Sequence, residues 1–234
     1  MTLSADDQKK AAALAAMDYV TDGMKLGLGT GSTAKHFVDF IGEKVKQGWK
    51  LICVPTSEAT RAQALSLNVP LTTLDETPEL DLTVDGADEF DAALTLVKGG
   101  GGALLREKIV AASSKRMVVI ADASKQVKNL GAFPLPIEVI PFASRSTLRK
   151  IEKAAHAAGC KGALQFRQRD GADYITDNGN LIIDCAFGII PDAPKLANLL
   201  QAIPGVVEHG LFINMADVAI LGTPQGAKLV KAKS

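Results

Sequence analysis

Several features that mark whole classes of protein are scarce in this sequence. Its 234 residues include three cysteines, one tryptophan and two tyrosines, and 26 Lys and Arg residues balance 26 Asp and Glu residues. Three isolated cysteines form no C-x-x-C pair, so they predict neither a disulfide framework nor a metal site. A net charge of zero gives no sign of a surface built for a polyanion. We therefore expect a globular protein with no nucleic-acid partner.

The three cysteines are Cys53, Cys160 and Cys185, and they stand apart from one another along the chain. A reactive thiol needs an electropositive setting, and none of the three lies in a glycine-rich turn or beside a histidine. We interpret them as small buried side chains in a reducing compartment.

Long apolar runs are also absent. The most apolar segments, such as Met117–Ile120 and Val218–Leu221, have the length of strands and are too short to span a membrane. The N-terminus carries two acidic and two basic residues before an alanine-rich stretch, and it lacks the basic region and apolar core of a secretory signal. We expect a soluble, cytoplasmic protein that makes no membrane contact.

Strands and helices alternate through the first half of the chain. Apolar spacing and turn residues predict helices over 6–19, 33–46, 57–67 and 103–113, and strands over 25–28, 51–55, 69–74, 80–84, 93–97 and 117–121. Short glycine turns join them. This alternation favours an α/β fold with a parallel sheet covered on both faces.

The character of the sequence changes after Leu130. Three prolines between residues 134 and 141 indicate a crossing into a second domain. Beyond them the pattern predicts a helix over 146–158, strands over 163–166, 173–176 and 181–185, and a helix over 193–202. The turn Asp177-Asn178-Gly179-Asn180 is a strong hairpin signal. We expect a small α+β domain, followed by strands over 212–214 and 218–221 that can return to the first domain.

Four loops at predicted strand ends carry polar or glycine-rich segments, and the first is Gly27-Leu28-Gly29-Thr30-Gly31-Ser32-Thr33. Its glycines allow a ligand to approach the backbone, and the following helix offers unpaired N–H groups. The hydroxyls of Thr30, Ser32 and Thr33 suit a phosphate or a polyol. A tight structural turn and a nucleotide site, with Ala34 at the third glycine position, stay open at this point.

The second loop is Asp85-Gly86-Ala87-Asp88-Glu89, which places three carboxylates at the end of a strand. Paired carboxylates in a cleft shift each other's proton affinity, which suits acid–base chemistry. They could also hold Mg²⁺, although no second cluster of oxygen ligands is evident. A solvated acidic turn is the plain alternative.

The third loop begins at Lys98 and continues through four glycines, Gly99 to Gly102, into a helix that carries Glu107. Consecutive glycines before a helix form a nest of N–H groups for an anion, and Lys98 can add a full positive charge. A flexible linker is a poor alternative, because apolar segments flank the glycines on both sides. Glu107, next to Lys108, could also be an ordinary surface residue.

The fourth loop is Ala121-Asp122-Ala123-Ser124-Lys125, and a helix-capping turn explains it equally well. The three histidines belong to no catalytic or metal-binding spacing, so we interpret them as structural or surface residues. These histidines are His36, His156 and His209.

Taken together, these loops resemble the ribose-5-phosphate isomerase A family. The segments that carry the resemblance are Gly29–Ala34, Asp85–Glu89, Lys98–Gly101 with Arg106-Glu107-Lys108, Ala121–Lys125, Pro134–Pro141, Thr176–Asn180 and Ile203–Glu208. Each is only moderately specific, but they follow one another in order over nearly the whole chain. The ordered set is therefore highly specific.

The resemblance implies a cofactor-free and metal-free aldose–ketose isomerase that interconverts D-ribose 5-phosphate and D-ribulose 5-phosphate in the pentose phosphate pathway. It implies a Rossmann-like catalytic domain, residues 1–130 plus 206–234, and a smaller ferredoxin-like α+β domain, residues 131–205. It also implies a homodimer or a larger homo-oligomer.

By the same resemblance, Glu107 is the proton-transferring base, Asp85 and Asp88 assist ring opening and proton handling, and Lys98 stabilises developing negative charge. The substrate-binding residues are then Thr30, Gly31, Ser32, Thr33, Asp85, Gly86, Ala87, Asp88, Lys98, Gly99, Gly100, Gly101 and Lys125. The chemistry is consistent, because an isomerase of this kind needs a base, a positive group at the enediolate oxygen and a phosphate anchor.

Two rival functions remain to be weighed. A non-catalytic sugar-phosphate sensor on the same scaffold usually carries a helix-turn-helix segment, for which we expect no room before the first helix. A dinucleotide-dependent enzyme would need an acidic residue at the end of the second strand, where the sequence has Val54-Pro55-Thr56. We therefore favour the isomerase.

Overall fold

The computed structural model describes residues 3–232, and the chain divides into two compact units. Unit 1 comprises the residues up to Ala87, residues Arg106–Lys125 and the residues from Asn214 onward. Unit 2 comprises Asp88–Leu105 and Gln126–Ile213. One boundary falls inside the loop Asp85–Glu89, and another falls between Leu105 and Arg106 in the helix that follows the third loop, so the sequence motifs contribute residues to both units.

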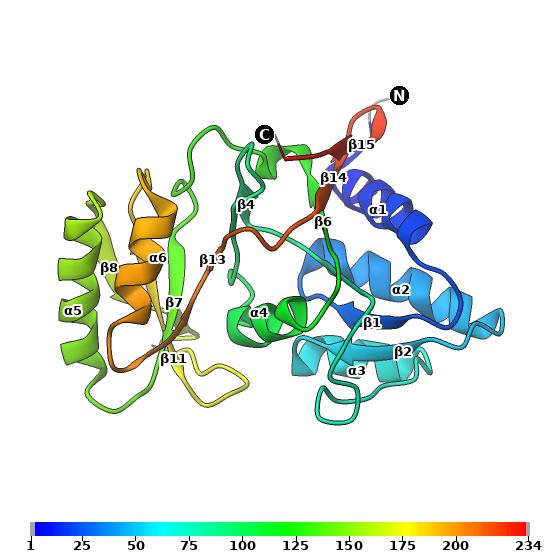
Figure 1. Cartoon of the computed structure of the whole chain (residues 1–234), viewed down its shortest axis with the longest axis horizontal. Coiled ribbons are helices and arrows are strands. Elements are labelled where there is room, and N and C mark those ends of the chain that lie inside the picture. Colours follow the sequence, from blue (N-terminus) through cyan, green and yellow to red (C-terminus); the bar gives the residue numbers. More distant parts are fainter. Residues whose placement is uncertain (1–2, 233–234) are drawn as a thin grey trace. The chain divides into compact units, whose positions relative to one another are not determined.

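Unit 1 is built on a six-stranded sheet with the order β15-β14-β6-β3-β1-β2. The strands are β1 (Lys25–Leu28), β2 (Ile52–Pro55), β3 (Leu82–Asp85), β6 (Met117–Asp122), β14 (Val218–Thr223) and β15 (Gly226–Val230). Five of them run parallel, and only β15 is antiparallel to its neighbour. The predicted α/β class with a mostly parallel sheet is therefore confirmed (Figure 1).

The apolar residues of these strands alternate between the two faces of the sheet. Alternate residues, among them Leu26, Leu28 and Val84, join one buried cluster with Phe37 of helix α2 (Ser32–Lys46) and Ala13 of helix α1 (Ala5–Ala16). Because side chains in a strand alternate in direction, the residues between them face the opposite side. One face is thus covered by α1 and α2.

The opposite face is contacted by helix α4. A methyl group at Gly27 would lie 2.1 Å from the Thr83 hydroxyl and 2.5 Å from a methyl of Val110 in α4. The helix can therefore approach the sheet only because residue 27 has no side chain. Helix α4 spans Leu104–Ala112.

The helices of unit 1 lie close to their predicted positions. They are α1 (Ala5–Ala16), a short 3-10 helix at Met17–Tyr19, α2 (Ser32–Lys46), α3 (Glu58–Ser66) and a 3-10 turn at Ala123–Lys125. Ser4 caps α1 and Ser57 caps α3 through their side-chain oxygens, as their positions suggest. The strand expected over 69–74 is wrong, since only Leu71 makes an isolated bridge, to Cys53.

Unit 2 contains a four-stranded antiparallel sheet with the order β12-β7-β11-β8. Its elements are β7 (Leu135–Val139), α5 (Ser144–Ala157), β8 (Ala163–Phe166), β11 (Leu181–Ala186), α6 (Ala193–Gln201) and β12 (Val206–His209). This βαββαβ order is the ferredoxin-like arrangement, with α5 and α6 side by side (Figure 1). The prediction of a ferredoxin-like α+β domain is confirmed.

Short strands complete unit 2. A three-stranded sheet joins β4 (Glu89–Phe90), β5 (Leu96–Val97) and β13 (Leu211–Phe212), and a hairpin pairs β9 (Gln168–Arg169) with β10 (Ala172–Asp173). The strand expected over 173–176 is thus mostly absent. The turn at 177–180 does form, because the Thr176 N–H donates to the Asn180 carbonyl at 2.9 Å.

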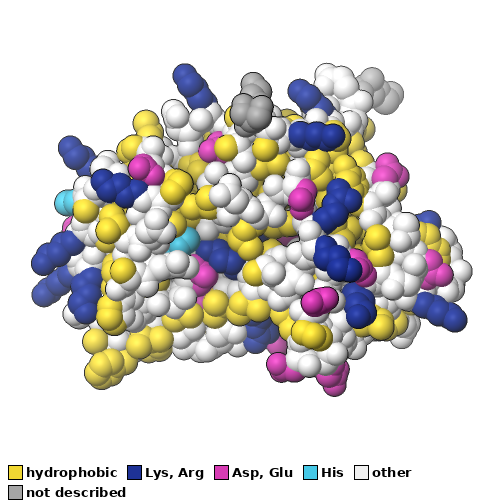
Figure 2. All heavy atoms as spheres, in the orientation of Figure 1, with side chains coloured by type: hydrophobic (Ala, Val, Ile, Leu, Met, Phe, Trp, Pro, Cys, Tyr) yellow, Lys and Arg dark blue, Asp and Glu magenta, His cyan; other side chains and the backbone are white. Residues whose placement is uncertain are grey.

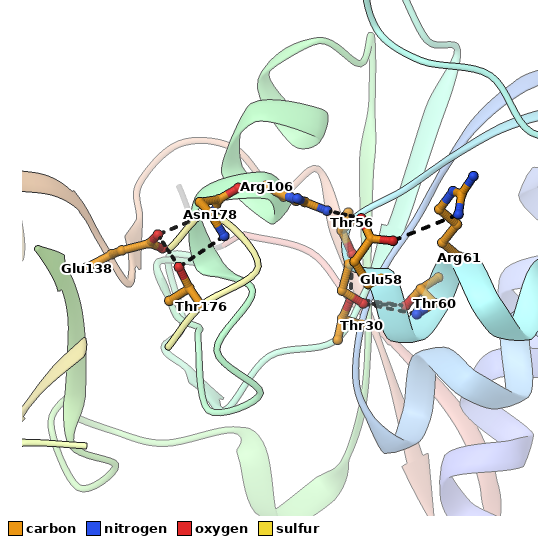
Figure 3. Close-up of polar contacts among 10 residues, drawn as sticks. Thr30, Thr56, Glu58, Thr60, Arg61, Arg106, Glu138, Thr176 and Asn178 are labelled. Carbon is orange, nitrogen blue, oxygen red and sulfur yellow. Dashed lines mark hydrogen bonds and ion pairs between the residues drawn. The ribbon is translucent and has the colours of Figure 1, made fainter. Parts of the chain in front are cut away.

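A buried carboxylate anchors this turn. Glu138 of β7 is fully buried, and its Oε1 accepts hydrogen bonds from the side chains of Thr176 at 2.9 Å, Asn178 at 3.3 Å and Asn180 at 2.9 Å. Figure 3 shows Glu138 directed toward Thr176 and Asn178. The turn therefore owes its conformation to a strand about forty residues earlier, as well as to its own glycine.

Charged side chains cover the surface without a large excess of one sign over most of the face drawn in Figure 2, apart from basic side chains that gather over α5. None of the helices within residues 3–232 is long and apolar enough to cross a membrane. All three cysteines are buried, as expected. Burial raises the pKa of the Cys53 thiol to about 12, which keeps it protonated and unreactive.

Candidate active site

The order of the parallel strands marks one place in unit 1 where loops can diverge. Strand β1 lies between β2 and β3, and the chain passes from β1 to β2 and then back across to β3. In sheets of this kind a ligand binds beyond the carboxyl ends of the two strands at which the direction of winding reverses. Here those strands are β1 and β3, which lead into the loops that begin at Gly29 and Gly86.

Asp85, the last residue of β3, ties these two loops together. It is fully buried, and its Oδ1 accepts hydrogen bonds from the Thr30 N–H at 3.0 Å and the Gly86 N–H at 2.7 Å. A methyl group at Gly29 would lie 2.2 Å from that oxygen and 2.5 Å from the Cα of Asp85. Gly29 is therefore required for the close approach of the two strand ends.

The hydroxyl of Thr30 belongs to a cluster of hydroxyls in unit 1. Its Oγ1 lies 2.7 Å from that of Thr56, 2.8 Å from that of Ser57 and 3.1 Å from that of Thr60. Figure 3 shows Thr30, Thr56 and Thr60 in this cluster. Thr56 and Thr60 in turn donate to the backbone carbonyls at 28 and 29, each at 3.0 Å. The cluster holds the loop after β1 in one conformation.

Helix α2 begins at the end of this loop without a side-chain cap. Gly31 occupies the N-cap position with φ of 122°, a conformation that favours glycine. Gly31 and Ser32 are exposed, and Thr33 is buried. The first N–H groups of an uncapped helix point outward at its positive end, so this helix can receive an anionic group.

Glu107 lies in the first turn of α4 and is buried, with 4 % of its surface exposed. The neighbouring Arg106 points differently, since its Nη1 donates to Glu58 Oε1 of α3 at 2.8 Å (Figure 3). This hydrogen bond lowers the pKa of Glu58 below its ordinary value. The interpretation of Glu107 as an ordinary surface residue is therefore wrong.

The fourth loop is partly explained by local capping. The Asp122 carboxylate accepts hydrogen bonds from the backbone N–H and the hydroxyl of Ser124. These contacts fix the 3-10 turn that carries Lys125 at its end. Lys125 is half-buried.

In unit 2, Asp88 is linked to the glycine loop. Its backbone N–H donates to the Val97 carbonyl at 2.9 Å, and its Oδ2 accepts the Gly100 N–H at 2.7 Å. The third carboxylate of the acidic segment points elsewhere, since Glu89 is buried and accepts hydrogen bonds from the N–H groups of Gly131 and Phe133. The acidic segment is therefore not a solvated turn, and Glu89 has a structural role.

Lys98 is almost fully buried, with 2 % of its surface exposed. Its backbone N–H donates to the Gly210 carbonyl at 2.8 Å, which joins the end of β5 to the segment before β13. Its Nζ lies 5.5 Å from the centre of the Phe212 ring, within range of a cation–π contact. A lysine is rarely buried to this degree, so its position at the start of the glycine loop is notable.

Arg167, Asp184 and Tyr174 also shape the glycine loop, and the sequence does not reveal them. Arg167 donates to the carbonyls of Gly99 and Gly100 and forms an ion pair with Asp184. Tyr174 lies against Gly102, where a methyl group would be 2.2 Å from its hydroxyl oxygen. These residues belong to no local motif, because they follow or lie on strands of the antiparallel sheet and its neighbouring hairpin.

The remaining candidates make ordinary contacts. His36 lies 3.0 Å from an oxygen of Asp6, and His209 is buried, with its Nδ1 accepting the Leu211 N–H at 3.3 Å. Within residues 3–232 no three His, Cys, Asp or Glu side chains gather in a way that could hold a metal ion.

The fold and these loops define a class of protein: a doubly wound α/β protein with buried ionisable side chains at the ends of its strands and in the first turn of a helix. The model of the ribose 5-phosphate isomerase A (phosphoriboisomerase A) family matches residues 52–226. The ribose-5-phosphate isomerase A of Parvibaculum lavamentivorans is 60 % identical over 98 % of this chain and its own full length. The chain belongs to the ribose-5-phosphate isomerase A family of aldose–ketose isomerases.

Solved structures agree with this assignment. Ribose 5-phosphate isomerase A from Methanocaldococcus jannaschii has a TM-score of 0.90 and 41 % identity over 97 % of this chain and all of its own. A D-ribose-5-phosphate isomerase solved in complex with phospho-erythronic acid has a TM-score of 0.90 and 38 % identity, and the match covers 98 % of this chain and all of that one.

Proposed function

We propose that this protein interconverts D-ribose 5-phosphate and D-ribulose 5-phosphate through an enediolate, with Glu107 as the base. The reaction moves one proton between C2 and C1 of the open-chain sugar. A carboxylate in the first turn of a helix is held rigidly enough to remove the proton from one carbon and return it to the next. No oxidant or reductant is needed, because the electrons stay within the substrate.

Three further side chains complete the proposed proton transfer. The Lys98 ammonium stabilises the negative charge that develops on the sugar oxygen as the enediolate forms. Asp85 and Asp88 handle the hydroxyl protons that move when the sugar ring opens and the enediolate forms. The fixed position of each carboxylate supports these roles, since each is held by backbone N–H groups of a neighbouring loop.

The substrate is proposed to bind through the backbone of two loops. The uncapped start of α2, with Gly31, Ser32 and Thr33, suits the phosphate because its N–H groups and hydroxyls can surround an anion. Lys125 adds positive charge for the same group. Among the other predicted binding residues, Thr30, Gly86 and Gly100 hold the Asp85 and Asp88 carboxylates through their N–H groups. Ala87, Gly99 and Gly101 contribute the backbone of the same loops.

One observation carries this proposal: three ionisable residues at the motif positions are buried. Asp85 has none of its surface exposed, Lys98 has 2 % and Glu107 has 4 %. Burying charges costs stability, and side chains whose proton affinity is controlled by burial are typical of catalytic sites. A non-catalytic sugar-phosphate sensor needs no buried base, and the curated relatives are named as isomerases, so we do not favour that alternative.

The proposal is tested by mixing the purified protein with ribose 5-phosphate and following formation of the ketose, without added cofactor and with EDTA present. We expect turnover that is unaffected by the chelator, and deuterium from D₂O should enter the product at C1. Tight binding without turnover would contradict the proposal and favour the sensor. Activity that disappears on chelation and returns with Mg²⁺ would make the aspartates metal ligands.

Three wider inferences follow from membership of the family. We propose that the protein acts in the non-oxidative pentose phosphate pathway, that it is cytoplasmic, and that it forms a homodimer or a larger homo-oligomer. Light scattering of the purified protein tests the last of these, because a monomeric mass at micromolar concentration would contradict it.

A further inference from the structure

Arg167, which follows strand β8, uses its whole guanidinium fork inside unit 2. Its Nε and Nη2 donate to the two oxygens of Asp184 at 2.9 and 2.6 Å. Its Nη1 donates to the carbonyl oxygens of Gly99 at 2.8 Å and Gly100 at 3.1 Å. Only 14 % of the Arg167 side chain is exposed. The arginine therefore connects a carboxylate on β11 to two successive peptide groups of the glycine loop.

These contacts determine which way the peptide groups point. A peptide group is planar and its C=O and N–H point in opposite directions. With the Gly99 carbonyl on Arg167, the Gly100 N–H of the same peptide group reaches Asp88 on the other side, at 2.7 Å. With the Gly100 carbonyl on Arg167, the Gly101 N–H must also point away from the arginine.

The Gly101 N–H is available to a ligand. Gly101 is exposed, and within residues 3–232 its N–H has no hydrogen-bond partner. Its carbonyl lies 3.4 Å from the Tyr174 hydroxyl, so the next peptide group is restrained as well. A loop of glycines can adopt many conformations. Arg167 and Tyr174 restrict this loop to one conformation, in which successive N–H groups point away from Arg167.

Charge makes arginine the suitable residue here. The Asp184 carboxylate balances the guanidinium, so the pair adds no net charge near the loop. The hydrogen bonds from the guanidinium to the two carbonyl oxygens also polarise those peptide groups. This polarisation makes their N–H groups stronger hydrogen-bond donors. A lysine could not make this set of contacts, because it has neither the planar fork nor five donors.

We propose that Arg167, held by Asp184, is a positioning residue for the isomerisation: it orients the Gly99–Gly101 peptide groups so that the Gly101 N–H binds an anionic oxygen of the sugar phosphate. The inference rests on the proposed function, since it names the residue that prepares the glycine loop for that substrate. Arg167 itself acts only through the loop.

The kinetic test compares Arg167→Lys with Arg169→Lys. Arg169 is exposed, lies on the next hairpin strand and stacks over the same Tyr174 ring at 4.5 Å, so it is a matched control for loss of an arginine. We expect kcat/KM of Arg167→Lys to fall by about 10- to 100-fold, since small errors in position have effects of this size. Affinity for phospho-erythronic acid should fall with it, and Arg169→Lys should stay close to the unmodified protein.

A rescue experiment separates positioning from general damage. Arg167→Ala should regain part of its activity when methylguanidinium is added, whereas Arg169→Ala should not respond. Asp184→Asn keeps the shape of the pair and should show a smaller loss of the same kind. Equal losses in the Arg167 and Arg169 variants, or no loss in either, would overturn the inference.

Hydrogen exchange of the backbone amides tests the inference about Arg167 without measuring turnover. The Gly100 N–H is bonded to Asp88, and the Gly102 N–H to the Gly99 carbonyl at 3.0 Å, so both report on the loop. In Arg167→Lys both should exchange about tenfold faster, with the amides of the six-stranded sheet unchanged. Unchanged exchange at both glycines would overturn the inference. An unmodified protein without isomerase activity would overturn the proposed function instead, and amide exchange would still decide this inference.

Discussion

Both loops are rich in glycine, but a carboxylate holds the backbone of the first, whereas a guanidinium joins a carboxylate in holding the second. In the loop after β1, the Asp85 carboxylate accepts the Thr30 N–H. In the loop after β5, the Arg167 guanidinium donates to the carbonyls of Gly99 and Gly100. Glycine-rich segments before helices thus share a flexible backbone. The side chains that hydrogen-bond to that backbone determine which of its N–H and C=O groups are left for a ligand.

The consequences of this difference concern rigidity. The first loop is closed by a buried carboxylate on the adjacent parallel strand, and its glycine meets backbone atoms there. The second loop is restrained by the ends of long side chains, namely Arg167, Asp88 and Tyr174. We therefore expect Gly29 of the first loop to tolerate no added methyl group, and Gly100 of the second to accept one at a smaller cost.

The largest effect is expected beyond the second loop, at Glu107. Glu107→Gln keeps the shape and removes the proposed base, so turnover should fall by about 10²–10⁴-fold. Binding of ribose 5-phosphate should change little, because the phosphate is proposed to bind at the start of α2 and not at Glu107. Steady-state kinetics and a binding titration measure the two quantities. Near-normal turnover would move the base to Asp85 or Asp88.

The second prediction compares the loops directly through Gly29→Ala and Gly100→Ala. Neither glycine has a positive φ, so both substitutions test space alone. The new methyl at 29 would lie 2.5 Å from the backbone of Asp85, whereas at 100 its nearest neighbours would be the far ends of Asp88 and Phe133. Urea unfolding should show a loss of about 1–3 kcal/mol for Gly29→Ala.

Gly100→Ala should lower the free energy of unfolding less than Gly29→Ala does. The side chains of Asp88 and Phe133 can rotate away from a new methyl group, whereas the backbone of β3 at Asp85 cannot move. A loss for Gly100→Ala equal to that for Gly29→Ala would mean that both loops are equally rigid, and the contrast drawn above would not hold.

The third prediction concerns the hydroxyl cluster of the first loop. Thr60→Val preserves the shape but leaves the Gly29 carbonyl and its partner hydroxyls short of a donor. We expect a loss of about 1 kcal/mol in the free energy of unfolding. Thr60→Ser keeps the hydroxyl and serves as the control. If serine proves as destabilising as valine, the methyl group and not the hydroxyl is what the loop needs.

The smallest effect is expected at Asp81, just before β3, whose carboxylate accepts the Lys25 N–H and the Lys115 ammonium at 3.0 and 2.9 Å. The Lys25 hydrogen bond, then Lys115, lowers the pKa of Asp81. A lowered folded-state pKa contributes stability above the unfolded pKa of about 3.9, and this is lost as the pH falls through the folded value.

Asp81→Asn should therefore lower stability at pH 7 by no more than about 1 kcal/mol, and the difference should vanish as the pH falls below about 4. Urea unfolding at several pH values measures it. Asp75→Asn, at an exposed aspartate, is the control. A difference between Asp81→Asn and the unmodified protein that persists undiminished in acid would show that the pair contributes through shape and not charge.

The sequence predicts those parts of the molecule that depend on local signals. Strand β1, helix α2 and the glycine turns follow from apolar spacing and backbone freedom, and the catalytic candidates follow from the order of the motifs. The three prolines between residues 134 and 141 predict a crossing between domains, yet strand β7 forms there and lies in the interior of its sheet. Pro136 is tolerated near the start of the strand, where its carbonyl accepts the Gly210 N–H.

Contacts that depend on strand pairing could not be predicted. Arg167 meets Asp184 because β8 pairs with β11 in one register, Phe166 opposite Ile183. Nothing in the residues beside Arg167 encodes that register. Strands β12 and β15 were likewise missed, since each is short and gains its conformation from a neighbour.

The pairing of β14 with β6 sets the order in which a growing chain can fold. Val218 lies opposite Val118, a hundred residues earlier, and α1 packs against β14. Helix α1 therefore cannot reach its final packing until β14 has been synthesised. The four-stranded sheet of unit 2 needs only residues 135–209, which leave the ribosome together. Unit 2 can therefore fold during translation, while the six-stranded sheet is completed only after β14 and β15 have been synthesised.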